Sequence, residues 1–143
     1  MKTKDKIIIF SGAIAICLNI VSTGGVYWQQ DAVTHENMGL WKTCKHGKCG
    51  TLKEHPDWRV TCQTFLLASC LLNFICVNMS ILCLPCKEKS RIPFVGSLLA
   101  ALFCASGLIV YSANASGAFG WSYYCSWSTV LLLVINGFYG CCQ

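Results

Sequence analysis

Cysteine and histidine side chains that can bind zinc or form a disulfide are concentrated between residues 44 and 55. Cys44 and Cys49 are separated by four residues, His46 lies between them, and His55 follows. Zinc accepts thiolate and imidazole ligands of this kind in a reducing compartment. On the oxidising side of a membrane, two cysteines this close are instead expected to form a disulfide. The chemistry therefore depends on where this segment lies.

Catalytic chemistry is not indicated by the remaining residues. The chain has no serine, histidine and aspartate in a catalytic order, no glycine-rich phosphate loop and no carboxylate pair that would face a cavity. His35, His46 and His55 fall in one short polar segment and lack a nucleophile once Cys44 is oxidised. We expect no enzyme activity, no catalytic residue, no cofactor and no metal site.

Charged residues are confined to three short windows, and this pattern sets the elements that position the cysteines. Asp, Glu, Lys and Arg occur only within residues 2–6, 31–59 and 87–91 of the 143-residue chain. One charged residue at the centre of a bilayer costs roughly 2.5–3.5 kcal/mol on an insertion scale. The long charge-free tracts therefore predict an integral membrane protein in contact with lipid.

Four helices account for these tracts, since one membrane span takes about 20 apolar residues. The last tract is long enough for two spans, and we divide it at the turn-forming residues 114–120. The predicted helices are 7–27, 61–84, 93–113 and 121–140, joined by an outer loop (28–60), an inner loop (85–92) and a short outer turn (114–120). The predicted fold is an all-α membrane protein, a four-helix transmembrane bundle in which residues 1–143 form a single tetraspan domain.

Two other classes are disfavoured by the same pattern. A β-barrel needs alternating polarity, which the apolar run 131–135 lacks. Nucleic-acid binding needs a basic stripe, whereas the basic residues are divided between the two sides of the predicted membrane. We therefore expect membrane lipid, and no nucleic acid, as a partner.

The orientation follows from the lysines and arginines next to the predicted spans. Six lie in residues 2–6 and 87–91, against five in residues 42–59, and the six are packed against the membrane ends. The positive-inside bias then places both termini in the cytoplasm. Residues 28–60 face the oxidising side, which predicts a Cys44–Cys49 disulfide that pins two short strands together. The first 25 residues also resemble a secretory signal peptide, but an apolar stretch that continues to Trp28 favours a retained helix.

The polar segment after the first span resembles the outer-loop signature of the claudin superfamily. The resemblance lies in Trp28, the run Gly39-Leu40-Trp41, and the pair Cys44 and Cys49. It is closer to the branch that contains peripheral myelin, epithelial membrane and lens membrane proteins, because 58–69 and 119–127 resemble the starts of that branch's second and fourth helices. The resemblance implies a small extracellular β-sheet contributed by the first outer loop.

The resemblance also implies functions. The first is membrane organisation or cell–cell contact at the plasma membrane, including cell junctions, with this chain or related tetraspan proteins as partners, laterally or across the contact. The second is an auxiliary subunit that modulates an ion channel or receptor. A third, a paracellular selective pore, is disfavoured by an outer loop and outer turn shorter than claudins usually have.

Several residues carry individual hypotheses. Lys42, Lys45 and Lys48 either contact ions or a partner or form a solvated loop face balanced by nearby carboxylates. Four cysteines at predicted cytoplasmic helix ends are either palmitoylation candidates or small apolar residues: Cys83, Cys86, Cys141 and Cys142. Small residues of the third helix and four asparagines within the spans are expected to pack inside the bundle: Gly96, Ala100, Cys104, Asn19, Asn73, Asn78 and Asn136.

Overall fold

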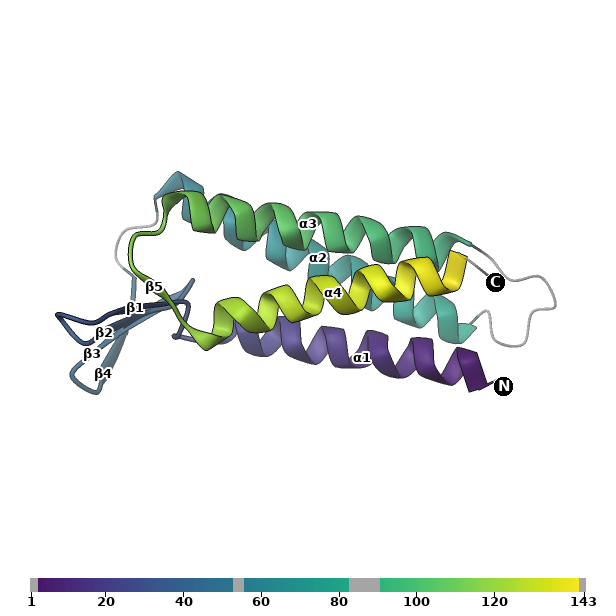
Figure 1. Cartoon of the computed structure of the whole chain (residues 1–143), viewed down its shortest axis with the longest axis horizontal. Helices are drawn as coiled ribbons and strands as arrows, with labels where there is room; N and C mark the ends of the chain where they lie inside the picture. Colours follow the sequence, from purple (N-terminus) through teal and green to yellow (C-terminus); the bar gives the residue numbers. More distant parts are fainter. Residues whose placement is uncertain (1–2, 53–55, 83–90, 142–143) are drawn as a thin grey trace.

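Four long helices run side by side, and a small β-sheet lies at one end of them (Figure 1). The computed structural model describes residues 3–52, 56–82 and 91–141. The helices are α1 (Thr3–Gly24), α2 (Asp57–Leu82), α3 (Ile92–Asn114) and α4 (Trp121–Cys141). The predicted four-helix fold is confirmed. The sheet lies at what we call the sheet end of the bundle, and both chain termini lie at the opposite end (Figure 1).

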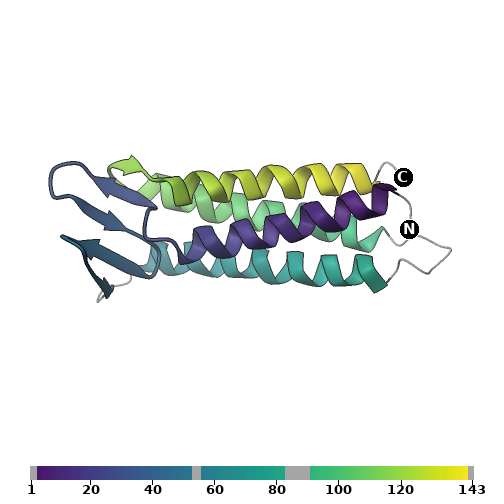
Figure 2. The ribbon, with the colours of Figure 1, turned by 90° about the horizontal axis from the view of Figure 1, so that it is seen from below.

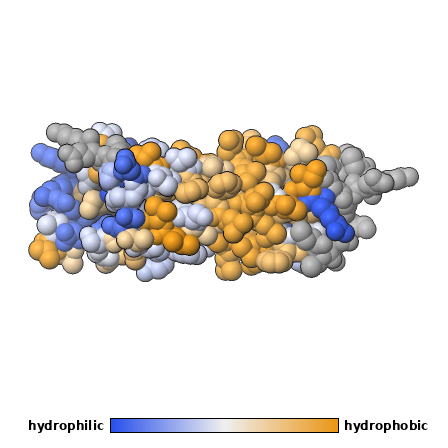
Figure 3. Space-filling view, turned by 90° about the horizontal axis from the view of Figure 1, so that it is seen from above, coloured by the Kyte–Doolittle hydropathy of each residue, from blue (hydrophilic) through white to orange (hydrophobic). Residues whose placement is uncertain are grey.

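Apolar composition makes these helices suitable for lipid. Among the described residues, three helical segments are long and apolar enough to cross a membrane: Asp5–Gly24, Asp57–Leu82 and Ile92–Asn114. The first nine residues of α4 are instead rich in serine, tyrosine and tryptophan, and α4 runs alongside the other helices over a similar length (Figure 2). Large apolar side chains point outward from all four helices. On the face shown in Figure 3 they form a hydrophobic band across the helices, away from the sheet end.

The helices pack as antiparallel neighbours, α1 against α2 and α4, and α3 against α2 and α4. Small residues permit the close approach, as predicted for α3, where Gly96, Ala100 and Cys104 are buried. A Cβ on Gly96 would collide with the Cys76 sulfur. The hydrophobic effect does not drive helices together within lipid. Close packing of this kind therefore supplies much of the free energy of their association.

Polar side chains within the bundle find hydrogen-bond partners either on a neighbouring helix or on their own helix. Asn136 Oδ1 accepts a hydrogen bond from Ser11 Oγ (2.6 Å), and Asn73 Nδ2 donates to the carbonyl of Gly12 (3.4 Å). Asn19 is buried and accepts from Thr23. Asn19 and Thr23 both belong to α1, so their bond lies within one helix. Asn78 differs from the other three asparagines because it is exposed, and it donates to Phe74 of its own helix. The prediction that asparagines pack inside the bundle was therefore correct for three of four.

The sheet is antiparallel throughout, with the strand order β4-β3-β2-β1-β5. Its strands are β1 (Gln29–Asp31), β2 (Glu36–Met38), β3 (Lys42–Lys45), β4 (Lys48–Thr51) and β5 (Ala118–Phe119). The first four come from the segment between α1 and α2, as expected. The fifth comes from residues 114–120, which the sequence indicated only as a turn. It pairs with β1 and ties the two connections at this end together.

Candidate functional site

Trp28 anchors the sheet to the bundle. It lies four residues after the end of α1 and is fully buried. Its indole Nε1 donates to the carbonyl of Ser22 (2.6 Å), in the last turn of α1, and its ring lies 5.0 Å from Tyr111 and 6.1 Å from Tyr123 between centroids. The backbone N–H of Trp28 donates to Met38. One residue thus connects α1, β2, α3 and α4.

The run Gly39-Leu40-Trp41 packs onto the same place from the other side. A Cβ on Gly39 would collide with the carbonyl of Gly25 and lie 2.9 Å from the Cα of Val26, so only glycine allows this approach. Leu40 is fully buried, and its carbonyl accepts a hydrogen bond from Gln63 Nε2 of α2 (2.7 Å). Trp41 packs against the same core.

Aromatic rings from α2, α3, β5 and α4 complete this junction between sheet and bundle. Trp58 lies 5.7 Å from Tyr111, and Phe119 stacks on Tyr123 at 4.3 Å. Each ring stabilises the junction by burying a large apolar area, and offset or edge-on contacts between rings add further stabilisation. Trp28, Gly39 and Leu40 are therefore buried where they hold the sheet in place, and Trp41 lies partly buried beside them.

Cys44 and Cys49 form the predicted disulfide. They are paired across β3 and β4, which are joined by a two-residue turn, His46-Gly47. Both turn residues have positive φ, +49° and +76°, the conformation that suits a tight hairpin between twisted strands. Because Cys44 is oxidised, the zinc set considered for residues 44–55 cannot form.

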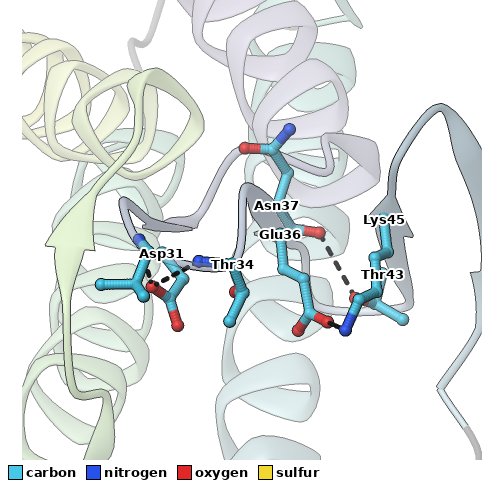
Figure 4. A network of polar contacts seen from close by, with 7 residues as sticks. Asp31, Thr34, Glu36, Asn37, Thr43 and Lys45 are labelled. Carbon is cyan, nitrogen blue, oxygen red and sulfur yellow. Dashed lines mark hydrogen bonds and ion pairs between the residues drawn. The ribbon is translucent and has the colours of Figure 1, made fainter.

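The loop between β1 and β2 is fixed by Asp31. One carboxylate oxygen accepts the backbone N–H groups of Val33 (2.8 Å) and Thr34 (3.3 Å), as Figure 4 shows for Thr34. These two hydrogen bonds, the Val33 bond foremost, hold the pKa of the Asp31 carboxyl below its usual value. His35 ends the loop with a φ of +51°.

The three lysines lie on the sheet and differ in their contacts. Lys45 forms an ion pair with Glu36 of the neighbouring strand (Figure 4). Lys48 is exposed and paired with Lys45 in the β3–β4 register, and Lys42 is exposed at the start of β3. An exposed ion pair contributes about 0–1 kcal/mol, so the lysines contribute surface charge more than stability.

Arg59 is a residue that the sequence analysis did not single out. It is buried in the first turn of α2, with its guanidinium 5.0 Å from the centre of the Trp58 ring. An arginine at the start of an otherwise charge-free span was the available signal. Gln63 falls within residues 58–69, which carried part of the resemblance, but its bond to Leu40 was not predicted. Tyr111 carried no signal, since its role depends on contacts between distant segments.

The palmitoylation hypothesis is not addressed by the structure. Cys83, Cys86 and Cys142 lie outside the described residues, and so does the side chain of Cys141, at the end of α4. Within the described ranges, no three side chains of the metal-binding types come together.

Comparison with known proteins supports the same interpretation. No family model matches the chain. Claudin domain-containing protein 2 from Mus musculus is 28% identical over 135 residues, which cover 85% of this chain and 75% of the relative. The Homo sapiens protein of the same name is 27% identical over 140 residues, 87% of this chain and 77% of the relative. The chain is therefore similar to claudin domain-containing proteins, and its four-helix bundle and disulfide-linked sheet are those of a multi-pass membrane protein.

Proposed function

We propose that this protein organises contacts between membranes, with the sheet projecting from the outer face of the plasma membrane. The proposal is carried by one observation: some residues of the sheet are buried against the helices, and others are exposed at its far end. Trp28 and Leu40 face the bundle and are fully buried. The loop 32–35 and the turn 46–47, which we call the distal rim, are exposed at the end of the sheet farthest from the helices (Figure 2).

The distal rim is a surface of defined shape. Val33 is 88% exposed at the tip of the β1–β2 loop, which the Asp31 hydrogen bonds hold in one conformation. The disulfide and the His46-Gly47 turn fix the neighbouring hairpin. Because little conformational entropy is left to lose on binding, such a rim suits contact with another protein. The partner we propose is a second copy or a related tetraspan protein.

The orientation of this proposal rests on charge and redox chemistry. The lysines and arginine of residues 2–6 and 87–91 favour the cytoplasm for the end that holds both termini. A disulfide at the sheet end fits an oxidising compartment. Both arguments favour a position of the rim outside the cell.

Expression in otherwise non-adherent cells tests the proposal. We expect a tagged chain to become enriched where two expressing cells touch. Val33→Asp should abolish that enrichment without lowering the amount at the surface, because it places a charge on the rim tip and leaves the junction intact. Thr51→Asp, on an exposed strand away from the rim, is the matched control. A uniform distribution of the unaltered chain would refute the contact role, and recovery of a stoichiometric larger partner in mild detergent would favour the channel-subunit hypothesis instead.

A further inference from the structure

All four helices line a small cavity in the half of the bundle that is nearer to the two chain termini. Gly12 of α1, Asn73 and Cys76 of α2, Ser97 of α3 and Asn136 of α4 belong to its lining. The cavity leaves about 10 Å³ for the centre of a water molecule. Roughly 10–15 Å³ on this measure holds one water molecule. The cavity therefore has room for a single water molecule and for no larger ligand.

Two asparagine amides at the cavity use only part of their hydrogen-bonding capacity. Asn73 is 1% exposed and Asn136 is 5% exposed. Asn73 Nδ2 donates to the carbonyl of Gly12 at 3.4 Å, and Asn136 Oδ1 accepts from Ser11 Oγ at 2.6 Å. Among the described residues, no donor reaches Asn73 Oδ1 and no acceptor reaches Asn136 Nδ2. Each amide offers both an acceptor oxygen and two N–H donors, so one acceptor and one donor group remain beside the cavity.

The surroundings of the cavity cannot complete these bonds. On the side toward the sheet, the apolar cluster of Ala15, Ala100, Ala101 and Leu133 fills the bundle. Hydrocarbon outside the helices offers neither donors nor acceptors. Buried polar groups of proteins pair with other protein groups or with ordered water. Water suits this cavity because one molecule both donates and accepts hydrogen bonds.

A third group at the cavity can bond to water. Ser97 Oγ is buried and donates to the carbonyl of Pro93 at 3.1 Å, within its own helix. A hydroxyl oxygen that donates its proton in this way still has lone pairs to accept a hydrogen bond. Buried water molecules typically make about three hydrogen bonds. Asn73, Asn136 and Ser97 together supply that number.

We propose that this cavity binds one water molecule, which accepts a hydrogen bond from Asn136 Nδ2 and donates hydrogen bonds to Asn73 Oδ1 and Ser97 Oγ. The direct bonds of the two asparagines connect α1 with α2 and α1 with α4. The water connects α2 with α4, which lie diagonally across the bundle, and joins α3 to both. It is thus a polar link shared by helices that are otherwise held by small-residue packing. This inference does not depend on the proposed contact function.

Water-edited NMR of the full chain in lipid nanodiscs tests the site, with ¹⁵N introduced only in asparagine. We expect the side-chain amides of Asn73 and Asn136 to receive magnetisation from water at short mixing times. Gly12→Ala should abolish both transfers, because the added Cβ lies 2.7 Å from Val77 Cγ2 and 3.8 Å from Asn136 Nδ2 and takes up cavity space. Gly24→Ala is the matched control in the same helix, since a Cβ there meets nothing within 4 Å.

A second variant keeps the test decisive if Gly12→Ala does not fold, which circular dichroism would show. Asn136→Leu is close to asparagine in size and removes the donor to the water, so the transfer to the Asn73 amide should be lost. Amides of Asn73 and Asn136 that receive no magnetisation from water in the unaltered chain would overturn the proposal. Transfers that persist in a folded Gly12→Ala variant would overturn it as well.

Radiolytic footprinting gives an independent measurement, because X-rays split bound water into hydroxyl radicals that oxidise the side chains beside it. Cys76 lines the cavity, whereas Cys104 is fully buried in the core cluster near the sheet end. Peptide mass spectrometry should find Cys76 oxidised and Cys104 spared, and Gly12→Ala should protect Cys76. Equal oxidation of the two cysteines in the unaltered chain would contradict a water molecule held at this place.

Discussion

Trp28 combines two properties that no other side chain offers together at its position. Its ring fills the junction between the helices and the sheet, and its Nε1 hydrogen bond satisfies a carbonyl in the last turn of α1. Carbonyls at a helix end lack partners within the helix, and an indole can supply one while it buries a large apolar area. Phenylalanine would retain the packing and lose the bond.

Gly39 allows a residue-scale test of how closely the loop must approach α1. Gly39→Ala should lower the free energy of unfolding by about 1–3 kcal/mol, because the added methyl group overlaps the backbone of the Gly25–Val26 segment. Gly50→Ala is the matched control, since a Cβ there meets nothing within 4 Å. Unfolding temperatures in detergent micelles compare the two, and equal values would contradict the tight fit.

The Asp31 carboxyl gives the β1–β2 loop a defined pH dependence. Its pKa is lowered in the folded chain, chiefly by the Val33 hydrogen bond, from an ordinary value of 3.8. Because the pKa is lower in the folded chain than in the unfolded chain, the ionised carboxylate stabilises the fold at pH values above the unfolded-state pKa. That contribution is lost as the pH falls through the folded-state pKa. Carboxyl NMR titration should give Asp31 a pKa below 3.8, and Val33→Pro should raise it by removing the main donor. A midpoint at or above 3.8 in the unaltered chain would contradict the assignment.

At the scale of elements, the helices were more predictable than the sheet. Absence of charge over long tracts is a strong signal for lipid-facing helices, and it placed all four. β5 was missed because two residues carry no alternation pattern, and its pairing with β1 arises only when α3 and α4 bring residues 118–119 beside residues 29–30. Local sequence cannot predict such a contact.

The β3–β4 hairpin is the element whose stability depends on a covalent bond. Replacing both Cys44 and Cys49 by serine should lower stability by about 2 kcal/mol, the loop-closure entropy for a cross-link this short. We expect the double variant to be retained before it reaches the cell surface. Surface biotinylation measures this, with Cys17→Ser, an exposed free cysteine in α1, as the control. Normal delivery of the double variant would show that the register holds the hairpin without its disulfide.

At the scale of the whole molecule, the sheet and the bundle form one unit. Gln63 of α2 bonds to Leu40, Tyr111 of α3 packs on Trp28, and β5 joins α3 and α4 to β1. Resemblance to the claudin outer loop identified Trp28 and Leu40 by type, but their burial could not be deduced. Trp28 packs against Tyr111 and Tyr123, both more than 80 positions away in the sequence, and Leu40 accepts a hydrogen bond from Gln63 of α2. Trp28 and Leu40 therefore hold the sheet against the helices, and the sheet in turn positions the distal rim.

The orientation of the whole molecule provides the last prediction. If the rim faces outside, a membrane-impermeant amine reagent applied to intact cells should label Lys42, Lys45 and Lys48, which lie on the exposed sheet. Lys87 and Lys89 belong to the charged window 87–91, which the positive-inside bias assigns to the cytoplasm. They should be labelled only after permeabilisation. Peptide mass spectrometry distinguishes the two sets in one sample, so each serves as the control for the other. Labelling of Lys87 and Lys89 in intact cells would reverse the topology, and a rim on the cytoplasmic side could neither keep its disulfide in a reducing compartment nor meet a second cell.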